Sequence, residues 1–118
     1  MKKLLLLLYA TGALAQNITY ENAPDYNKLV AVIYRIEGGE KADVPYGIHI
    51  GNRRFTKEQA RVICQNTCRN NYKRWKDSRS TKTYFDFLAD RYCPPSADPQ
   101  GNANWKRNVK AIYNRPLL

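Results

Sequence analysis

The sequence predicts a mainly α fold of about four helices, with a short β-hairpin or extended segment after the first helix. Apolar residues recur at helical spacing in four stretches, which are separated by polar breaks or by glycine and proline. Between the first two stretches, residues 44–55 alternate apolar and polar side chains around Pro45, Gly47 and Gly51. This combination is typical of a short strand pair. We therefore expect one compact α+β domain.

The first helix is predicted from the apolar spacing after Pro24, with Asn22 as a candidate N-cap. Gly38 or Gly39 is expected to end it through a left-handed cap. Its apolar positions are Tyr26, Leu29, Val30, Ile33 and Ile36. This helix delivers a glutamate, Glu37, at its C-terminal edge.

Three further helices follow. Thr56 and Gln59 form a capping box that opens the second helix, which we expect to run to about Lys76. Residues 83–92 predict a third helix, which the Cys-Pro-Pro sequence at 93–95 ends. A tight turn is expected at 98–101, and Asn104 is a candidate cap for a last helix that ends before Pro116.

The N-terminus predicts a secretory signal peptide over residues 1–15. Lys2 and Lys3 precede an apolar run, and Ala13-Leu14-Ala15 supplies a small-x-small cleavage site. Residues 16–118 then form a single domain, which we expect to be secreted or periplasmic, without stable membrane insertion, and monomeric. Removing two lysines from 20 Lys+Arg leaves 18 against 10 Asp+Glu, a net charge of +8. This excess favours a polyanionic partner such as a cell-wall polymer, an anionic lipid surface or nucleic acid.

The cysteines predict one disulfide and one free thiol. Cys64 and Cys68 are four residues apart on a predicted helix, a spacing that rarely suits a bridge. We therefore expect Cys93 to pair with one of them and favour Cys64. Because three cysteines and one histidine in this arrangement are a weak zinc pattern, we expect no metal, and no other cofactor is indicated.

Glu37 is the candidate catalytic residue. A carboxylate at a helix C-terminus is locally unfavourable, because the helix dipole places partial negative charge there. Partial burial would also disfavour the charged form, so we expect a raised pKa. A carboxylic acid that stays protonated near neutral pH is what cleavage of a glycosidic bond requires. The alternative is an ordinary solvated glutamate at the end of a helix.

The pattern Ile33-x-x-x-Glu37-Gly38-Gly39, followed after a short loop by Pro-Tyr-Gly-Ile at 45–48, resembles the lysozyme-like superfamily. Lytic transglycosylases and goose-type lysozymes are most similar in pattern. The resemblance implies a lysozyme-like fold, Glu37 as general acid/base, and Gly47 and Ile48 in a substrate-lining segment. The downstream sequence also resembles small exported bacterial proteins of this kind.

The sequence departs from the family pattern directly after Ile48. His49 stands where a methionine is expected, and Ile50 stands where a sugar-binding glutamine is expected. His49 is a candidate replacement for the sugar contact; the other interpretation is a half-exposed strand histidine. Four aromatic residues could stack on sugar rings or pack in the core: Tyr46, Tyr84, Tyr92 and Trp105.

No second carboxylate is selected by spacing; the available ones are Glu40, Asp43, Asp86 and Asp90. A pair would be needed for the usual hydrolytic mechanisms, so a lone glutamate favours the transglycosylase type over the hydrolase. We expect an exported enzyme that cleaves peptidoglycan glycan strands. The alternative is a non-catalytic secreted protein that binds anionic cell-surface polymer and keeps the fold. No nucleic-acid partner is expected because no nucleic-acid motif accompanies the charge, and one histidine excludes a two-histidine ribonuclease.

Overall fold

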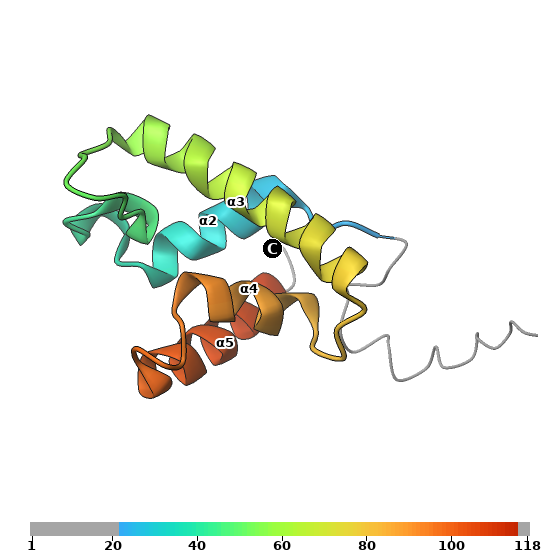
Figure 1. Cartoon of the computed structure of the whole chain (residues 1–118). Helices are drawn as coiled ribbons and strands as arrows, with labels where there is room; N and C mark the ends of the chain where they lie inside the picture. Colours follow the sequence, from blue (N-terminus) through green and yellow to red (C-terminus); the bar gives the residue numbers. More distant parts are fainter. Residues whose placement is uncertain (1–21, 116–118) are drawn as a thin grey trace, which may run out of the picture.

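The computed structural model describes residues 22–115, so the predicted signal peptide lies outside the described residues. Within this range the chain is mainly helical, as predicted (Figure 1). Four α-helices follow one another: α2 (Tyr26–Ile36), α3 (Lys57–Ser78), α4 (Tyr84–Tyr92) and α5 (Pro99–Tyr113). Two short 3-10 helices, η2 (Gly39–Lys41) and η3 (Pro45–Gly47), lie in the connection between α2 and α3.

The sequence predicted a β-hairpin or an extended segment at 44–55; no β-hairpin is seen, because residues 22–115 contain no strand. Tyr46 and Gly47 instead adopt left-handed backbone, with φ of 60° and 67°. Two successive residues of this kind cannot continue an extended strand. The apolar alternation has another cause, because Tyr46 and Ile48 are buried while Ile50 is 45% exposed.

The starts of α2 and α3 follow local capping chemistry. Asp25, rather than Asn22, caps α2, and its Oδ1 accepts a hydrogen bond of 3.1 Å from the Lys28 N–H. The capping box of α3 is confirmed, because Thr56 and Gln59 each accept a hydrogen bond from the backbone N–H of the other.

The last helix begins earlier than predicted. Asp98 is its N-cap, and Oδ1 of this residue accepts a 2.9 Å hydrogen bond from the Gly101 N–H. Pro99 occupies the first turn, where its missing N–H costs no helical hydrogen bond. The residues that predicted a turn therefore begin the helix, and Asn104 lies inside it.

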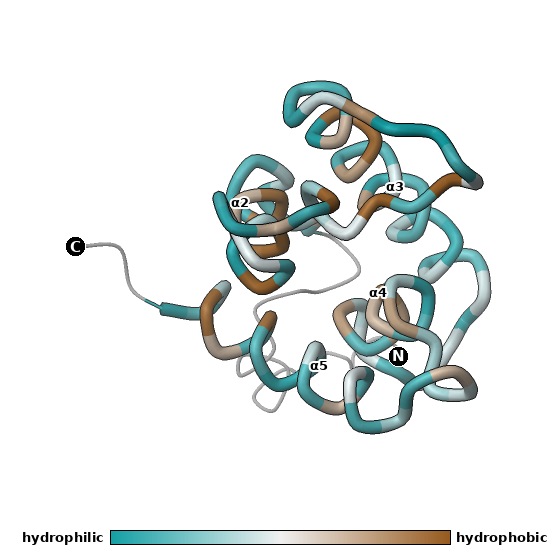
Figure 2. Tube along the Cα trace, turned by 90° about the vertical axis from the view of Figure 1, so that its left-hand side faces the viewer, coloured by the Kyte–Doolittle hydropathy of each residue, from teal (hydrophilic) through white to brown (hydrophobic). Residues whose placement is uncertain are grey.

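The core lies where the four helices meet. α2 packs against both α3 and α5, and α4 packs against the same two helices. Figure 2 shows brown apolar residues interrupting the teal polar ones along the helices. Tyr72 and Trp75 of α3 contact Tyr84 of α4, whose ring contacts Phe85, and Phe85 meets Tyr113 of α5. This aromatic cluster joins α3, α4 and α5 and fixes the position of α5 against the rest.

None of the helices over residues 22–115 combines the length and the apolar character that crossing a bilayer would require.

Candidate functional site

Glu37 is the C-cap residue of α2, as the sequence predicted. Its backbone N–H still donates to the Ile33 carbonyl at 2.9 Å, and Gly38 then turns the chain with a φ of 112°. Glycine suits that turn because other residues rarely adopt a positive φ. The glutamate is thus held by a regular helix on one side and a sharp turn on the other.

The Glu37 side chain is bound from a distant part of the chain. Nε1 of Trp105 in α5 donates a hydrogen bond of 3.0 Å to Oε2 of Glu37. The Trp105 ring is 6% exposed and stacks on Tyr92, with ring centroids 5.3 Å apart and an interplanar angle of 23°. Oη of Tyr92 in turn donates to Sγ of Cys64 at 3.0 Å. A continuous set of contacts therefore fixes one carboxyl oxygen of Glu37.

The other carboxyl oxygen lies over Gly47. A β-carbon at position 47 would be 2.6 Å from Oε1 of Glu37 and 2.7 Å from its Cδ, closer than real contacts allow. Gly47 also has a φ of 67°, so two requirements favour glycine here. Its role in this structure is to leave room for the acid.

The environment raises the pKa of Glu37. Burial is the main cause, because it disfavours the charged carboxylate. The hydrogen bond from Trp105 and the charge of His49 both lower the pKa, but they do not cancel the effect of burial. The predicted direction of the shift is confirmed. A carboxyl group in this setting is suited to donate a proton.

Most residues that were predicted to line the substrate are buried. Tyr84 is 0% exposed and its hydroxyl donates to the Cys68 carbonyl, so its assignment as a sugar-stacking residue is wrong. Tyr46 and Ile48 are also buried, and the Tyr46 ring packs on Tyr34 at 5.0 Å. The core therefore covers the ring faces of Tyr46 and Tyr84.

Trp105 was also predicted to stack on sugar. In the structure its ring stacks on Tyr92 and its N–H binds Glu37.

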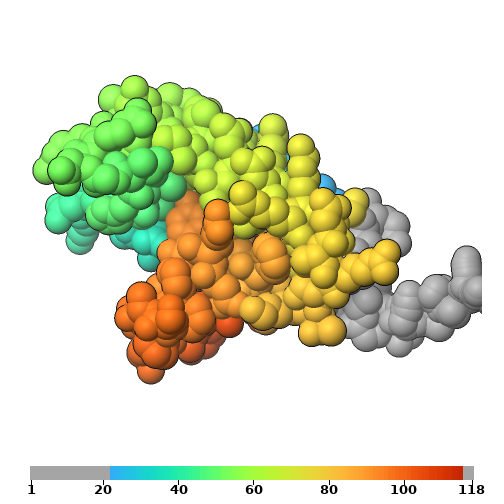
Figure 3. Space-filling view, viewed as in Figure 1, coloured from blue at the N-terminus to red at the C-terminus, as the bar shows by residue number. Residues whose placement is uncertain are grey.

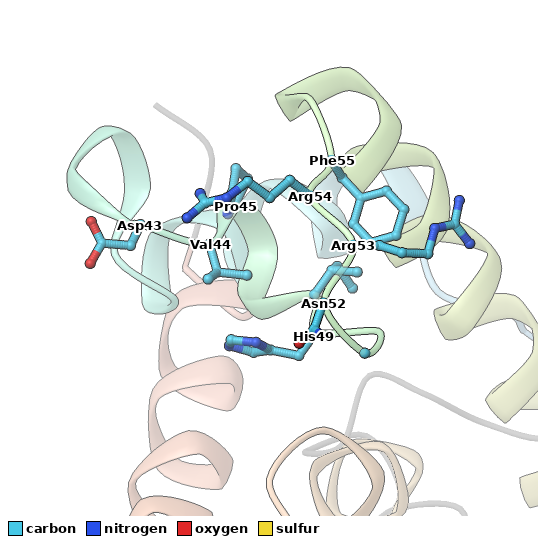
Figure 4. Close-up of a pocket in the computed structure, with 10 residues that line it drawn as sticks. Asp43, Val44, Pro45, His49, Asn52, Arg53, Arg54 and Phe55 are labelled. Carbon is cyan, nitrogen blue, oxygen red and sulfur yellow. The ribbon is translucent and has the colours of Figure 1, made fainter.

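His49 is exposed and remains available. It lies in non-helical, non-strand backbone, and its charge acts on Glu37. It also lines a pocket of about 230 Å³ formed by residues 43–55, to which Arg54 and Asn52 contribute (Figure 4). Glu37 does not line this pocket, but Ile48, which does, directly follows Gly47, over which the Glu37 carboxyl lies.

The other candidate carboxylates are mostly held in ion pairs. Lys57 binds Glu40 at 2.7 Å, Lys110 binds Asp86 at 2.7 Å, and two lysines bind Asp90. Figure 4 shows the carboxylate of Asp43 directed away from the pocket that its residue lines. None of the four is placed as an evident partner of Glu37.

The predicted disulfide between Cys64 and Cys93 is not formed in this structure, where all three cysteines are thiols. Cys64 and Cys68 are both 0% exposed and lie one helical turn apart, joined by a thiol hydrogen bond. The Tyr92 hydroxyl is the neighbour of the Cys64 sulfur.

The molecular surface has a recess next to the segment that carries Glu37. Figure 3 shows a recess between the segment that carries η2 and η3 and the one around the start of α5. Glu37 lies two residues before η2, and the Glu37–Trp105 hydrogen bond joins the two sides. Within the part of the chain that the structure describes, no group of three histidine, cysteine or acidic side chains is placed to hold a metal ion.

Sequence reasoning missed two features of the site. The first is the role of the Trp105 N–H, although a buried indole N–H usually needs an acceptor and Glu37 was available. The second is Arg54, which belongs to the expected hairpin and carries no signal of its own in the sequence. Comparisons with protein families, with characterised proteins and with solved structures found no significant match.

Proposed function

We propose that this protein is an exported, lysozyme-like enzyme that cleaves peptidoglycan glycan strands with Glu37 as its general acid and base. The observation that carries the proposal is the half-buried carboxyl of Glu37, which has a raised pKa and one oxygen bound by Trp105. Burial keeps the proton on the acid at higher pH, and the hydrogen bond fixes its direction.

The hydrogen bond also determines which oxygen carries the proton. An indole N–H can only donate, so Oε2 of Glu37 acts as an acceptor. The acidic proton is then on Oε1, which lies over Gly47. Oε1 is the atom we expect to face the glycosidic oxygen.

One carboxyl group is sufficient for the reaction that we propose. Glu37 donates its proton to the glycosidic oxygen as the bond from that oxygen to the anomeric carbon breaks. The resulting carboxylate then takes a proton from a hydroxyl of the same sugar as that hydroxyl attacks the anomeric carbon. The product is an anhydro sugar, and Glu37 is protonated again. Because the other nearby acids are in ion pairs or point away, this course is favoured over hydrolysis with two carboxylates.

The test uses purified peptidoglycan and mass spectrometry of the released fragments. We expect anhydro ends from the unmutated protein and no fragments from Glu37→Gln, which keeps the size of the side chain. Glu58→Gln is the matched control, because Glu58 is exposed on α3 and pairs only with Arg61 among the residues described. Circular dichroism should show that all three proteins are folded.

Two results would overturn the proposal: no cleavage by the unmutated protein, or equal cleavage by Glu37→Gln. Reducing ends in place of anhydro ends would keep the role of Glu37 but assign hydrolysis.

The positive charge favours one second candidate, a non-catalytic secreted protein that binds anionic cell-surface polymer. The chain has 20 Lys+Arg against 10 Asp+Glu. Binding of such a polymer that is lost with rising salt, together with no cleavage, would support this candidate over the enzyme.

A further inference from the structure

The pocket shown in Figure 4 has the size of a substituent rather than of a sugar chain. Its volume is about 230 Å³, below the roughly 300–1,000 Å³ of usual small-molecule sites. Val44, Pro45 and Ile48 supply apolar walls, and Asn52 supplies an amide. A small group with both carbon and polar atoms would fit these walls.

Arg54 and Arg53 are the basic residues of the pocket lining, and His49 adds a polar ring. In Figure 4 the Arg54 guanidinium and the His49 ring lie on opposite sides of Val44, both bordering the pocket. Over residues 22–115, Arg54 makes no ion pair, although five other basic side chains do. The Asp43 carboxylate points outward, so it does not neutralise the pocket.

The neighbouring Arg53 differs in direction. Its guanidinium lies over the Phe55 ring, 5.0 Å from the centroid, and Figure 4 shows it directed away from Arg54. The two adjacent arginines therefore have the same charge but different surroundings. Both arginines line the pocket, but in Figure 4 only the Arg54 guanidinium lies near Val44.

We propose that this pocket binds a carboxylate of the glycan substrate, with Arg54 as the main ligand and His49 and Asn52 as further polar contacts. The proposal rests on the proposed function. Guanidinium groups suit carboxylates because they donate two parallel hydrogen bonds. Ile48 of the pocket wall directly follows Gly47, and the Glu37 carboxyl lies over Gly47, so a carboxylate bound here is held by the segment that also contacts the acid.

The carboxylate of a peptidoglycan strand can come from two sources: the lactyl group of a sugar without a peptide, or the peptide stem itself. Binding is measured by calorimetry with three soluble probes. They are a disaccharide with a free lactyl carboxylate, the same disaccharide with a tetrapeptide stem, and a neutral N-acetylglucosamine tetramer. The probe whose affinity depends on Arg54 identifies the source.

We expect Arg54→Gln to weaken binding of at least one carboxylate-bearing probe about tenfold, the size of effect typical for a lost charge-assisted hydrogen bond. Binding of the neutral tetramer should be unchanged. Arg53→Gln removes the same charge one position away and should weaken binding of the carboxylate-bearing probes less than Arg54→Gln does, because the Arg53 guanidinium lies over the Phe55 ring. Arg54→Lys should restore part of the loss, because a lysine keeps the charge but not the paired hydrogen bonds.

Equal effects of Arg53→Gln and Arg54→Gln would overturn the proposal, and so would an Arg54→Gln effect on the neutral probe of the same size. Absence of any preference for carboxylate-bearing probes, including no binding of all three, would also overturn it. If Arg54-dependent binding is found but peptidoglycan is not cleaved, the enzyme proposal fails and the pocket stands. If cleavage depends on Glu37 but binding does not depend on Arg54, the pocket proposal fails and the enzyme proposal stands.

Discussion

Nε1 of Trp105 and Oε2 of Glu37 are 3.0 Å apart, although the two residues are separated by 68 positions in the chain. The hydrogen bond joins the end of α2 to the middle of α5. It lowers the pKa of Glu37, against the larger effect of burial. In the mechanism that we propose, the proton is on Oε1 and Trp105 is a positioning residue for the acid.

Trp105→Phe should raise the pKa of Glu37 further, because it removes a donor that favours the carboxylate. The phenyl ring can still pack on Tyr92. Activity needs the protonated acid, so the pH at which activity falls should move upward, and the maximal rate should drop about tenfold as the acid loses its fixed direction. A pH–rate profile and an NMR titration of Glu37 would measure both effects.

Trp75→Phe is the control for that change. The Trp75 N–H donates to the Lys82 carbonyl, away from Glu37, so the pH profile should stay in place. A pH profile of Trp105→Phe that coincides with the unmutated one would contradict the positioning role.

Gly47→Ala should disturb the acid directly, because the new methyl would lie 2.6 Å from Oε1 of Glu37. Gly51→Ala is the control, because it introduces the same kind of backbone strain without a contact to Glu37. Gly51 has a similar φ of 57°, but nothing lies within 4 Å of the position that its new methyl would take. Both variants should lose about 1–2 kcal/mol of stability from the left-handed backbone. Only Gly47→Ala should also disturb the Glu37 carboxyl, as an NMR titration of Glu37 and chemical denaturation would show.

Glu37→Gln should make the protein more stable at pH 7. The folded-state pKa of Glu37 is raised above the unfolded value of about 4.3, so the ionised group disfavours the folded state. This cost is absent below pH ~4.3, grows as the pH rises through the folded pKa, and is constant above it. Urea denaturation at pH 7 and at pH 3.5 should show a gain only at the higher pH.

Glu58→Gln should have the opposite effect on stability at pH 7 and make the protein slightly less stable. Its hydrogen bond with Arg61 lowers the pKa of Glu58, so its ionised form slightly favours the folded state at pH 7. If Glu37→Gln destabilised the protein at pH 7, the burial of the acid would be contradicted.

The thiols can be counted by alkylation without reductant. Cys93 is partly exposed and should react in the folded protein, although burial raises the pKa of its thiol and slows the reaction. Cys64 and Cys68 are fully buried and should react only after denaturation, giving three labels in all. One label after denaturation would instead indicate a disulfide, and peptide mapping would identify its cysteines.

The sequence was sufficient for the helices whose signals are local. The capping box of Thr56, the apolar spacing of α2 and the glycines after Glu37 each act within a few residues, and each was found. The β-hairpin predicted for residues 44–55 is not seen, because alternating burial also arises in an irregular loop that folds over a core. Tyr46 has left-handed backbone and its ring packs on Tyr34, and no local pattern encodes either feature.

The site was predicted only in part for the same reason. Glu37 was identified from its place on a helix, whereas its partner lies on another helix far along the chain. Tyr84 and Trp105 have the same aromatic character in sequence, but the first fills the core and the second binds the acid. Only the arrangement of the helices distinguishes them.

The long separation between Glu37 and Trp105 has a consequence for the life of the protein before it folds. A chain in which α5 has not docked lacks the hydrogen bond from Trp105 to Oε2 of Glu37. The proposed acid therefore has its complete set of contacts only once α5 packs against α2.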